Sequence, residues 1–378
     1  MSLRFGRALM VALTVLAVVV GTALGAASGR TAPRLVVAAP NLQFNQEGVP
    51  GDVAARALNA LAAKQNPKGS AAGLTNVHFI LNWVPNVEFS GLWIAQKYGW
   101  WKQAGLSITY TPWSPSVFPE TQVPERGGNT FGFQAGAAIA IARSKGVPLK
   151  ALYTDTQKTV FGLTVLKKSH ITKLQDLRGK RVGYQSQELY VPETMLAFVG
   201  LKPSDWKPVP VGFNIVQLTQ GNVDAYLVFV TNEPIALKLQ GVPAITFPAY
   251  QYGYHFYDDV LFTYNGLIQK DPTLVRKVVT NVAKGFQWAH SHPDQTARFT
   301  VKNYFPAGKG ETGAQHLQQQ ILESRAFIPY SKDSSGRFSG LMSTSYWQDS
   351  INTLFKYHLI KSKPDAATIY TNQFNPYR

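Results

Sequence analysis

The stretch from residue 78 to residue 113 most constrains how this chain can fold, because it alternates strand, polar turn, helix and strand. Apolar residues recur at every second position over 77–81, which is the pattern of a strand. Pro85 prevents regular continuation of that strand, and Asn86 stands where it can cap a helix over residues 91–98. A glycine ends this helix before the second strand begins. The stretch therefore predicts one strand–helix–strand unit of a doubly wound α/β protein.

The first turn of this unit is rich in amides, a carboxylate and aromatic rings. Small ligands of α/β proteins bind at such turns, beyond the carboxyl ends of the strands. Four strand-end turns are expected to converge on one cleft, and they cover residues 82–89, 134–137, 184–188 and 229–233. Each offers donors and acceptors beside aromatic faces, the combination that a flat heterocycle needs.

The candidate ligand-binding residues are polar or aromatic and lie in or near these turns. They are Asn82, Trp83, Asn86, Glu88, Phe89, Trp113, Gln134, Tyr184, Ser186, Glu188, Phe229, Asn232, Glu233 and Tyr257. Trp83 either stacks on the ligand or is an ordinary core tryptophan. Glu88 and Glu188 either accept hydrogen bonds from ring or amino N–H groups or are solvated surface carboxylates. Tyr257 ends an aromatic run that either walls the cleft or packs on itself at a sheet edge.

Strands and helices alternate along the rest of the chain, which predicts mostly parallel sheets covered by helices. We expect the chain to cross into a second lobe at residues 163–166 and to return near residues 260–262. The predicted parts are a signal peptide or signal anchor (1–28), a linker with a short helix (29–74), the beginning of lobe I (75–165), lobe II (166–260) and the remainder of lobe I (261–378).

The first 28 residues have the pattern of an export signal. A basic start precedes an apolar run over residues 8–27 and then small residues. About 20 apolar residues suffice to span a bilayer, so either the segment is cleaved or it stays as a membrane tether, which we favour. The chain has no cysteine, which excludes a lipid-modified cysteine, disulfides and thiolate metal sites. The protein is therefore expected outside the cytoplasm, in the periplasm or at the cell surface.

The formal net charge of +16 is spread along the chain without a basic block. No nucleic-acid recognition motif accompanies it, so we expect no nucleic-acid partner. The sequence also lacks G-x-S-x-G, Walker and G-x-G-x-x-G motifs, and its seven histidines are scattered. No catalytic residue, metal ligand or cofactor is therefore predicted.

Several separate motifs resemble one known family. The run LNWVPN…GLWIAQKYGWWKQAGL is similar to the opening of the NMT1/THI5-like family. Residues 171–183 resemble the "dLkGKrVg" signature of binding proteins in this class, and residues 220–225 resemble a second signature. The family groups solute-binding proteins of ABC importers for thiamin-precursor pyrimidines, relatives for riboflavin and alkanesulfonates, and the fungal thiamin-pyrimidine synthase.

The resemblance implies an α/β, two-lobe periplasmic-binding-protein-like fold of type II, in which a two-stranded hinge joins the lobes. It also implies an exported, monomeric binding protein that closes on a small planar heterocycle and delivers it to an ABC permease in the cytoplasmic membrane. A thiamin-precursor pyrimidine is the first candidate ligand and riboflavin or another flavin the second. An alkanesulfonate or nitrate-type anion is the alternative within the same mechanism.

The synthase of this family provides the enzymatic alternative. The resemblance puts Gln134 where the synthase has the lysine that anchors pyridoxal phosphate, and Ala138 where it has a histidine. An amide cannot form a Schiff base and alanine has no ring to donate. The cysteine-rich iron motif of the synthase cannot occur in a chain without cysteine. We therefore expect no enzymatic activity.

Overall fold

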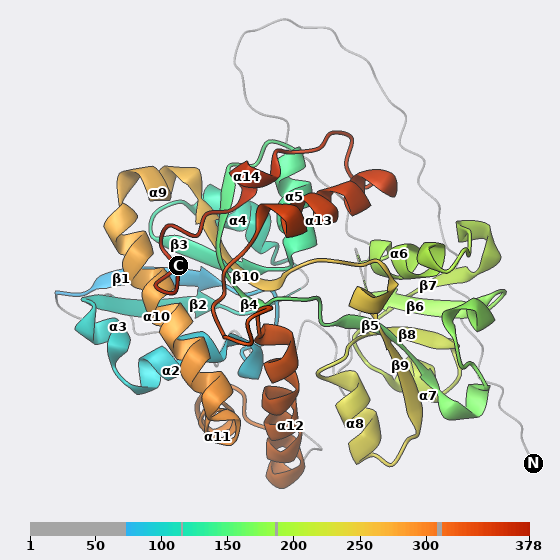
Figure 1. The fold of residues 1–378 in the computed structure, drawn as a ribbon. Helices are drawn as coiled ribbons and strands as arrows, with labels where there is room; N and C mark the ends of the chain where they lie inside the picture. Colours follow the sequence, from blue (N-terminus) through green and yellow to red (C-terminus); the bar gives the residue numbers. More distant parts are fainter. Residues whose placement is uncertain (1–72, 115, 186–187, 308–311) are drawn as a thin grey trace, which may run out of the picture. The chain divides into compact units, whose positions relative to one another are not determined.

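The computed structural model describes residues 73–114, 116–185, 188–307 and 312–378, all of which lie in one unit of the chain, Asn41–Arg378. The predicted signal segment (1–28) and nearly all of the predicted linker (29–74) lie outside the described residues. The described chain forms two five-stranded sheets, and each carries helices on both faces (Figure 1).

The first sheet has the strand order β2-β1-β3-β10-β4. Its strands are β1 (Thr75–Ile80), β2 (Leu106–Thr111), β3 (Thr130–Gln134), β4 (Leu149–Thr156) and β10 (Asp258–Tyr264). β1 pairs in parallel with β2 and β3, whereas β10 is antiparallel to both β3 and β4. The sheet is thus mostly parallel, as predicted, with one antiparallel strand inserted beside the edge strand β4.

The second sheet repeats this arrangement with the order β7-β6-β8-β5-β9. Its strands are β5 (Phe161–Leu166), β6 (Arg181–Gln185), β7 (Lys207–Val211), β8 (Ala225–Phe229) and β9 (Ala244–Pro248). β6 is parallel to β7 and β8, and β5 is antiparallel to β8 and β9. In each sheet the antiparallel strand is the one that the chain enters on arriving from the other sheet.

Helices and short 3-10 turns connect these strands. The α-helices are α2 (Ser90–Lys97), α3 (Trp100–Gln103), α4 (Pro119–Arg126), α5 (Gly136–Ser144), α6 (Tyr190–Phe198), α7 (Val216–Thr219), α8 (Glu233–Leu239), α9 (Asn265–Lys270), α10 (Pro272–Ser291), α11 (Pro293–Asn303), α12 (Gly313–Ser331), α13 (Thr344–Lys356) and α14 (Ala366–Ile369). The 3-10 turns are η1 (Val87–Phe89), η2 (Lys167–Ser169), η3 (Leu174–Leu177), η4 (Pro203–Asp205) and η5 (Ala249–Tyr252).

Alternate residues of a strand face opposite sides of its sheet, and this decides how the helices pack. Phe79 packs with α2 and α10, whereas its neighbour Ile80 packs into the cluster that contains α5 and α13. In the second sheet, Leu227 lies in the cluster with α6, and Val228 packs with α7 and α8. Buried apolar residues thus cover both faces of both sheets.

The chain crosses between the sheets through residues 157–160 and 249–257. The first crossing therefore precedes the predicted position, 163–166, because those residues already belong to β5. The predicted return at 260–262 falls inside β10 of the first sheet, so the return crossing also comes earlier. Buried strands with continuous apolar runs look alike in sequence on either side of a crossing, which explains both shifts.

The predicted cap by Asn86 falls on a different element, since α2 begins after Phe89 without a side-chain cap. Asn86 caps η1, where its side chain accepts a hydrogen bond from the Glu88 N–H at 3.0 Å. Asp271 caps α10 by accepting from the Leu274 N–H at 2.8 Å, and Pro272 occupies the first helical position. The two caps fix where η1, in the turn after β1, and the long helix α10 begin.

Two glycines allow α2 and α10 to approach each other. A Cβ at Gly285 would collide with the Gly91 carbonyl oxygen, and a Cβ at Gly91 would collide with the Phe286 ring. Because a backbone oxygen cannot move aside as a side chain can, the contact at Gly285 tolerates no side chain.

Substitution Gly285→Ala is therefore expected to lower the free energy of unfolding by about 3 kcal/mol, through overpacking between α2 and α10. Gly313→Ala, at a helical position with open space around its Cβ, is the matched control and should change it by less than about 0.5 kcal/mol. Urea unfolding followed by tryptophan fluorescence measures both. Equal stability of the two variants would contradict the close approach of these helices.

Candidate functional site

The turn after β1 places the first group of candidate residues. Asn82 and Trp83 are partly exposed, whereas Asn86 and Glu88 are buried. Asn82 Oδ1 is enclosed and has no hydrogen-bond partner within the described structure. Pro85 and the Asn86 cap turn the chain inward, so that Glu88 enters the protein instead of facing solvent. Of the two alternatives for Glu88, the surface carboxylate is therefore the wrong one.

Trp83 belongs to a cluster of three aromatic rings. Its ring centroid lies 5.2 Å from that of Trp113 and 4.5 Å from that of Phe213. Trp113 and Phe213 meet edge to face at 5.4 Å. Phe213 follows β7 of the second sheet, so this cluster joins residues that precede and follow the first crossing. Trp83 keeps an exposed part, which an ordinary core tryptophan would not.

The most unusual feature of this region is a group of acidic side chains, which we call the carboxyl cluster. Its members are Glu88, Asp155, Glu188, Glu233, Asp258, Asp259 and Glu323. Glu88, Asp155, Asp258, Asp259 and Glu323 are each at most 3% exposed, and Glu188 and Glu233 are partly buried. Acids are rarely buried without partners, so such a group indicates a functional site.

Burial is the main reason why Glu88, Glu188, Glu233, Asp259 and Glu323 have a raised pKa and hold their protons more tightly than usual. It raises the pKa of Glu88 and of Glu233 to about 7, and that of Glu188 and of Glu323 to about 8. The pKa of Asp259 rises well above its ordinary value through burial and the neighbouring Glu88. The four glutamates therefore exchange protons near neutral pH.

Asp258, which follows the return crossing, forms hydrogen bonds with the first crossing. Its Oδ2 accepts hydrogen bonds from the Thr159 hydroxyl at 2.6 Å and from the Val160 N–H at 3.0 Å. Its carbonyl oxygen accepts from the hydroxyls of Thr154 and Thr156 at the end of β4. Burial raises the pKa of Asp258 to about 6, while the bond from Thr159 opposes that rise. The first crossing and the return crossing thus meet at one carboxylate.

Helix α12 connects the turn after β1 with the turn after β8. Gln320 accepts from the Val87 N–H at 3.4 Å and donates to Glu323 at 2.7 Å. The adjacent Gln319 donates to Asn232 Oδ1 at 3.0 Å. The sequence reasoning missed this helix as a part of the site, although its adjacent glutamines and buried glutamate are a signal for it.

The remaining candidates from the second sheet take several positions. Tyr184 and Phe229 are partly buried, and Phe229 packs edge to face on Phe161 at 4.7 Å. Glu233 opens α8, and its carboxylate accepts from the Phe229 N–H at 2.8 Å. Ser186 lies outside the described residues.

Gln134 stands at the end of β3, as predicted, but its side-chain amide is hydrogen-bonded to other groups of the protein. It donates to Glu120 Oε2 at 2.7 Å, and its own oxygen accepts from the Ala135 N–H at 2.9 Å. Burial raises the pKa of Glu120, and Gln134 opposes this rise by donating to it. The Gln134–Glu120 pair therefore acts as one polar group.

Two candidate residues lie in the core. Phe89 is fully buried and packs edge to face on Phe133 at 5.5 Å. Tyr257 is 4% exposed, and its hydroxyl accepts from the Ser343 N–H at 2.9 Å while its ring contacts Tyr346. Within the aromatic run, Tyr257 packs against α13, whereas Tyr254 packs on Tyr190 and Phe161. Neither residue enters the site proposed below.

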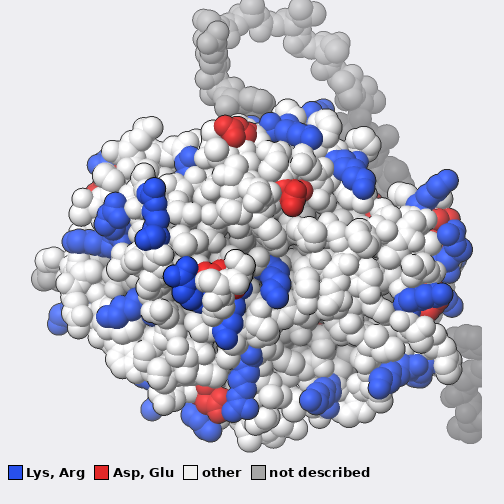
Figure 2. Space-filling view, in the orientation of Figure 1, with Lys and Arg blue, Asp and Glu red and all other residues white. Residues whose placement is uncertain are grey.

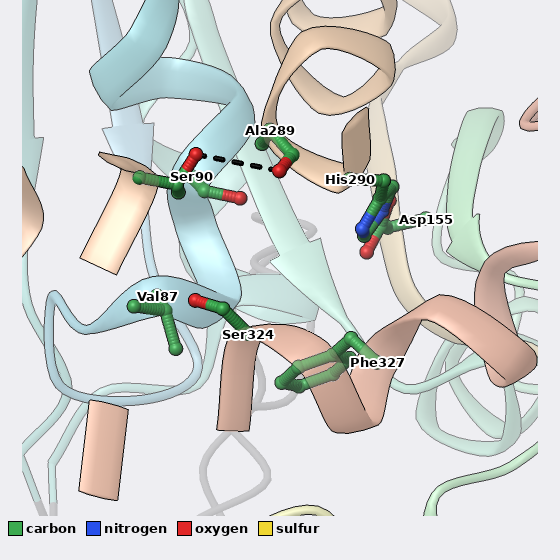
Figure 3. Close-up of a pocket in the computed structure, with 8 residues that line it drawn as sticks. Val87, Ser90, Asp155, Ala289, His290, Ser324 and Phe327 are labelled. Carbon is green, nitrogen blue, oxygen red and sulfur yellow. Dashed lines mark hydrogen bonds and ion pairs between the residues drawn. The ribbon is translucent and has the colours of Figure 1, made fainter. Parts of the chain in front are cut away.

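A small pocket of about 10 Å³ lies beside η1 (Figure 3). Asp155 and His290 lie side by side at its wall, and the His290 Nε2 and Asp155 Oδ1 atoms are 2.7 Å apart. This volume holds about one water molecule, whereas small-molecule sites occupy about 300–1,000 Å³. The cavity is therefore not the place of a heterocycle.

The basic side chains on one face of the described structure are dispersed. On the face shown in Figure 2, Lys and Arg are scattered and do not form one block. Across residues 73–378 with their short gaps, no group of three His, Asp or Glu residues has the arrangement of a metal site. In the same described ranges, no helix is both long and apolar enough to cross a membrane.

Comparison with known proteins identifies relatives of two kinds. Residues 86–296 match the family model described as NMT1/THI5 like. The riboflavin-binding protein RibY of Chloroflexus aurantiacus is 22% identical over 312 residues, which are 80% of this chain and 87% of that protein. The formylaminopyrimidine-binding protein of Halalkalibacterium halodurans is 22% identical over 300 residues, 78% and 88% of the two chains.

The second kind of relative is an enzyme. A 4-amino-5-hydroxymethyl-2-methylpyrimidine phosphate synthase of Saccharomyces cerevisiae is 26% identical over 233 residues, 57% of this chain and 68% of the enzyme.

Among solved structures, the periplasmic aliphatic sulphonate binding protein SsuA of Escherichia coli aligns with a TM-score of 0.57 at 15% identity, over 78% of this chain and 91% of SsuA. This likeness shows the periplasmic-binding-protein fold.

The raised pKa values of the carboxyl cluster predict how stability depends on pH. Between the unfolded pKa of about 4.5 and the folded pKa near 7, the folded state binds more protons than the unfolded state. The free energy of unfolding should therefore fall as pH rises from 5 to 8, by up to about 1.4 kcal/mol per pH unit for each excess proton. Urea unfolding at several pH values measures this slope.

Replacing Glu88 by Gln is expected to flatten this slope, because the variant has one fewer buried acid to ionise. Asp333→Asn is the control, since the pKa of Asp333 is lowered to about 2 and this exposed-loop acid does not titrate between pH 5 and 8. A wild-type protein that gains stability across this range would contradict the buried, protonated cluster.

Proposed function

Because this chain belongs to the NMT1/THI5-like family, we propose that it is an exported solute-binding protein of an ABC importer that captures a small planar nitrogen heterocycle. A thiamin-precursor pyrimidine is the first candidate solute, and riboflavin or another flavin is the second. Two clusters carry this proposal, the carboxyl cluster and the aromatic cluster of Trp83, Trp113 and Phe213, because the turn after β1 contributes Glu88 to the first and Trp83 to the second.

The polarity of the site favours a solute that donates hydrogen bonds. A carboxylate accepts from ring N–H and amino groups, and a carboxyl that exchanges protons near neutral pH suits a ligand with both donors and acceptors. The rings of the aromatic cluster offer faces and edges for a flat molecule. RibY and the formylaminopyrimidine-binding protein are named for solutes of this shape.

The anionic alternative, an alkanesulfonate or nitrate, is less suited to these surroundings. The described groups that act on Glu88 through their charge are Asp155, Asp258 and Glu233, all acids. A negatively charged solute placed among them would suffer repulsion in a region of low dielectric constant. The structural likeness to a sulphonate-binding protein concerns the fold and carries no ligand assignment.

Capture without chemical change is favoured over the synthase reaction. Gln134, which takes the position of the synthase lysine in the sequence resemblance, is a hydrogen-bonded amide and offers no amine for a Schiff base. Ala138 offers no imidazole. We propose that the protein works as a monomer outside the cytoplasm, hands its solute to a membrane permease, and is held near it by residues 8–27 as a tether.

Thermal-shift screening with pyrimidine, flavin and sulfonate panels tests the solute class. At 100 times its Kd, a true ligand adds about 2.7 kcal/mol of stability. For a chain of 378 residues, this corresponds to a rise of roughly 3–5 °C in Tm. Stabilisation by an aminopyrimidine or a flavin is expected. Stabilisation by sulfonates alone, or steady conversion of a heterocycle into product, would reject the proposal.

Trp83→Ala should weaken binding of the stabilising heterocycle at least about tenfold, because stacking contributes roughly 1–1.5 kcal/mol beyond buried area. Isothermal titration of the folded variant measures the Kd. Trp100→Ala is the control, since Trp100 lies on α3, where its ring contacts Tyr98 and Lys284 away from the site. Unchanged affinity in Trp83→Ala would remove Trp83 from the site.

A further inference from the structure

A group of aromatic rings lies on the surface of the helices that cover the first sheet, outside the candidate site. Tyr98, directly after α2, is 39% exposed, and its ring stacks on that of Trp100 on α3 at 5.3 Å. From α10, the Trp288 ring meets Tyr98 edge to face at 5.1 Å and stacks on His292 at 4.2 Å. Trp100 and Trp288 are partly exposed and His292 is exposed. Since α2 contacts both α3 and α10 (Figure 1), these rings form one continuous surface, which single exposed rings do not.

Two lysine ammonium groups lie over these rings. Lys97 Nζ is 5.2 Å from the centre of the Tyr98 ring and 4.9 Å from that of Trp288. Lys284 Nζ is 3.8 Å from the centre of the Trp100 ring. Both lysines are exposed, and an ammonium group has three N–H donors, so each can hold a ring on one side and an anion on the other.

The helices that carry these rings are basic. Helices α2, α3 and α10 contain Lys or Arg but no Asp or Glu. On α10, Lys277, Lys284 and Trp288 follow one another at spacings of seven and four residues, which places them on one side of the helix. The acid of α11, Asp294, is engaged by Arg325 of α12 at 2.6 Å. The rings thus lie in basic surroundings, and we call the following six residues the basic aromatic face: Lys97, Tyr98, Trp100, Lys284, Trp288 and His292.

We propose that the basic aromatic face docks on the surface of a bilayer that contains anionic lipids. Trp and Tyr gather at membrane–water interfaces, because the ring enters the headgroup region while its polar group stays hydrated. Lysines beside such rings are attracted by anionic headgroups. In the docked state Lys97 and Lys284 bind lipid phosphates, and Tyr98, Trp100 and Trp288 insert between headgroups. The contact involves helices of the first sheet and neither crossing, so it leaves solute capture unhindered.

Two other occupants fit this face less well. A second copy of the chain that docked through the same face would bring the lysines of both copies toward one another, and like charges repel. An acidic protein would satisfy the lysines. A bilayer satisfies both the lysines and the half-exposed rings, and the tether proposed for residues 8–27 would keep it at a high effective concentration.

Quenching of tryptophan fluorescence by brominated lipids tests this docking on the full chain. The vesicles contain phosphatidylglycerol and phosphatidylcholine in equal parts, with acyl chains brominated next to the headgroup. The wild-type protein should be quenched, and added salt should reverse the quenching. Replacing both Trp100 and Trp288 by Phe keeps the rings but removes the two fluorophores, so most of the quenching should disappear. Trp206→Phe, at a tryptophan that is 5% exposed and precedes β7 of the second sheet, is the control and should leave it unchanged.

A pair of lysine variants separates this face from general charge attraction. Each lysine near an anionic surface changes the ratio of docked to undocked protein about fivefold, so Lys97→Gln with Lys284→Gln should lower that ratio about 25-fold. Lys207→Gln with Lys361→Gln removes two exposed lysines elsewhere, before and after which no residue of the face lies close in sequence, and should leave the ratio near the wild-type value.

Three results would overturn the proposal: no quenching, equal quenching by vesicles of phosphatidylcholine alone, or an equal response of the two lysine variants. A dimer seen by sedimentation velocity without vesicles, and lost in the double tryptophan variant, would assign the face to a second copy instead. The test needs no solute, so failure of the solute proposal leaves it intact. Conversely, thermal shifts by solutes should be the same in these variants as in the wild-type chain.

Discussion

The position of acidic side chains where the two sheets join is the constraint on which this structure depends. Asp258 receives hydrogen bonds from both the end of β4 and the first crossing, while it begins the strand that follows the return crossing. A buried acid of this kind needs such donors, because its desolvation otherwise costs several kcal/mol. Threonines at 154, 156 and 159 provide hydroxyls there. These hydrogen bonds hold the junction together through Asp258 Oδ2 and its carbonyl oxygen, whereas Asp258 Oδ1 is buried without a partner in the described structure.

The same acids give the candidate site its chemical character. Helix α12 carries amides that reach both the turn after β1 and the turn after β8, and the aromatic cluster joins residues from before and after the first crossing. A solute held there would contact groups connected to the junction of the crossings. Hinged binding proteins close around a ligand by rotation at such connecting segments. Polar contacts to a solute in this site would therefore lie next to the segments at which such a rotation occurs. Family membership and the fold agree with this arrangement.

Much of the fold could be predicted from sequence, since strands such as 75–80 and the helix from Pro272 have clear periodicity and caps. The crossings were misplaced because buried strands on both sides read as uniform apolar runs. The site was harder to predict. Glu88 and Asn232 were recognised at strand ends, but Asp259 lies in a left-handed backbone position and Glu323 in the middle of a helix, where only tertiary packing shows that they are buried. Phe89 and Tyr257 were chosen for their aromatic rings, which the core uses instead.

The central claim is that this chain holds an unchanged heterocycle against a carboxylate. A crystal structure of the protein soaked with the most stabilising compound tests it most directly. The account predicts an intact ring beside Trp83, with an N–H group within hydrogen-bond distance of Glu88. A chemically altered compound, a ring bound away from both residues, or an anion seated at Glu88 would contradict it.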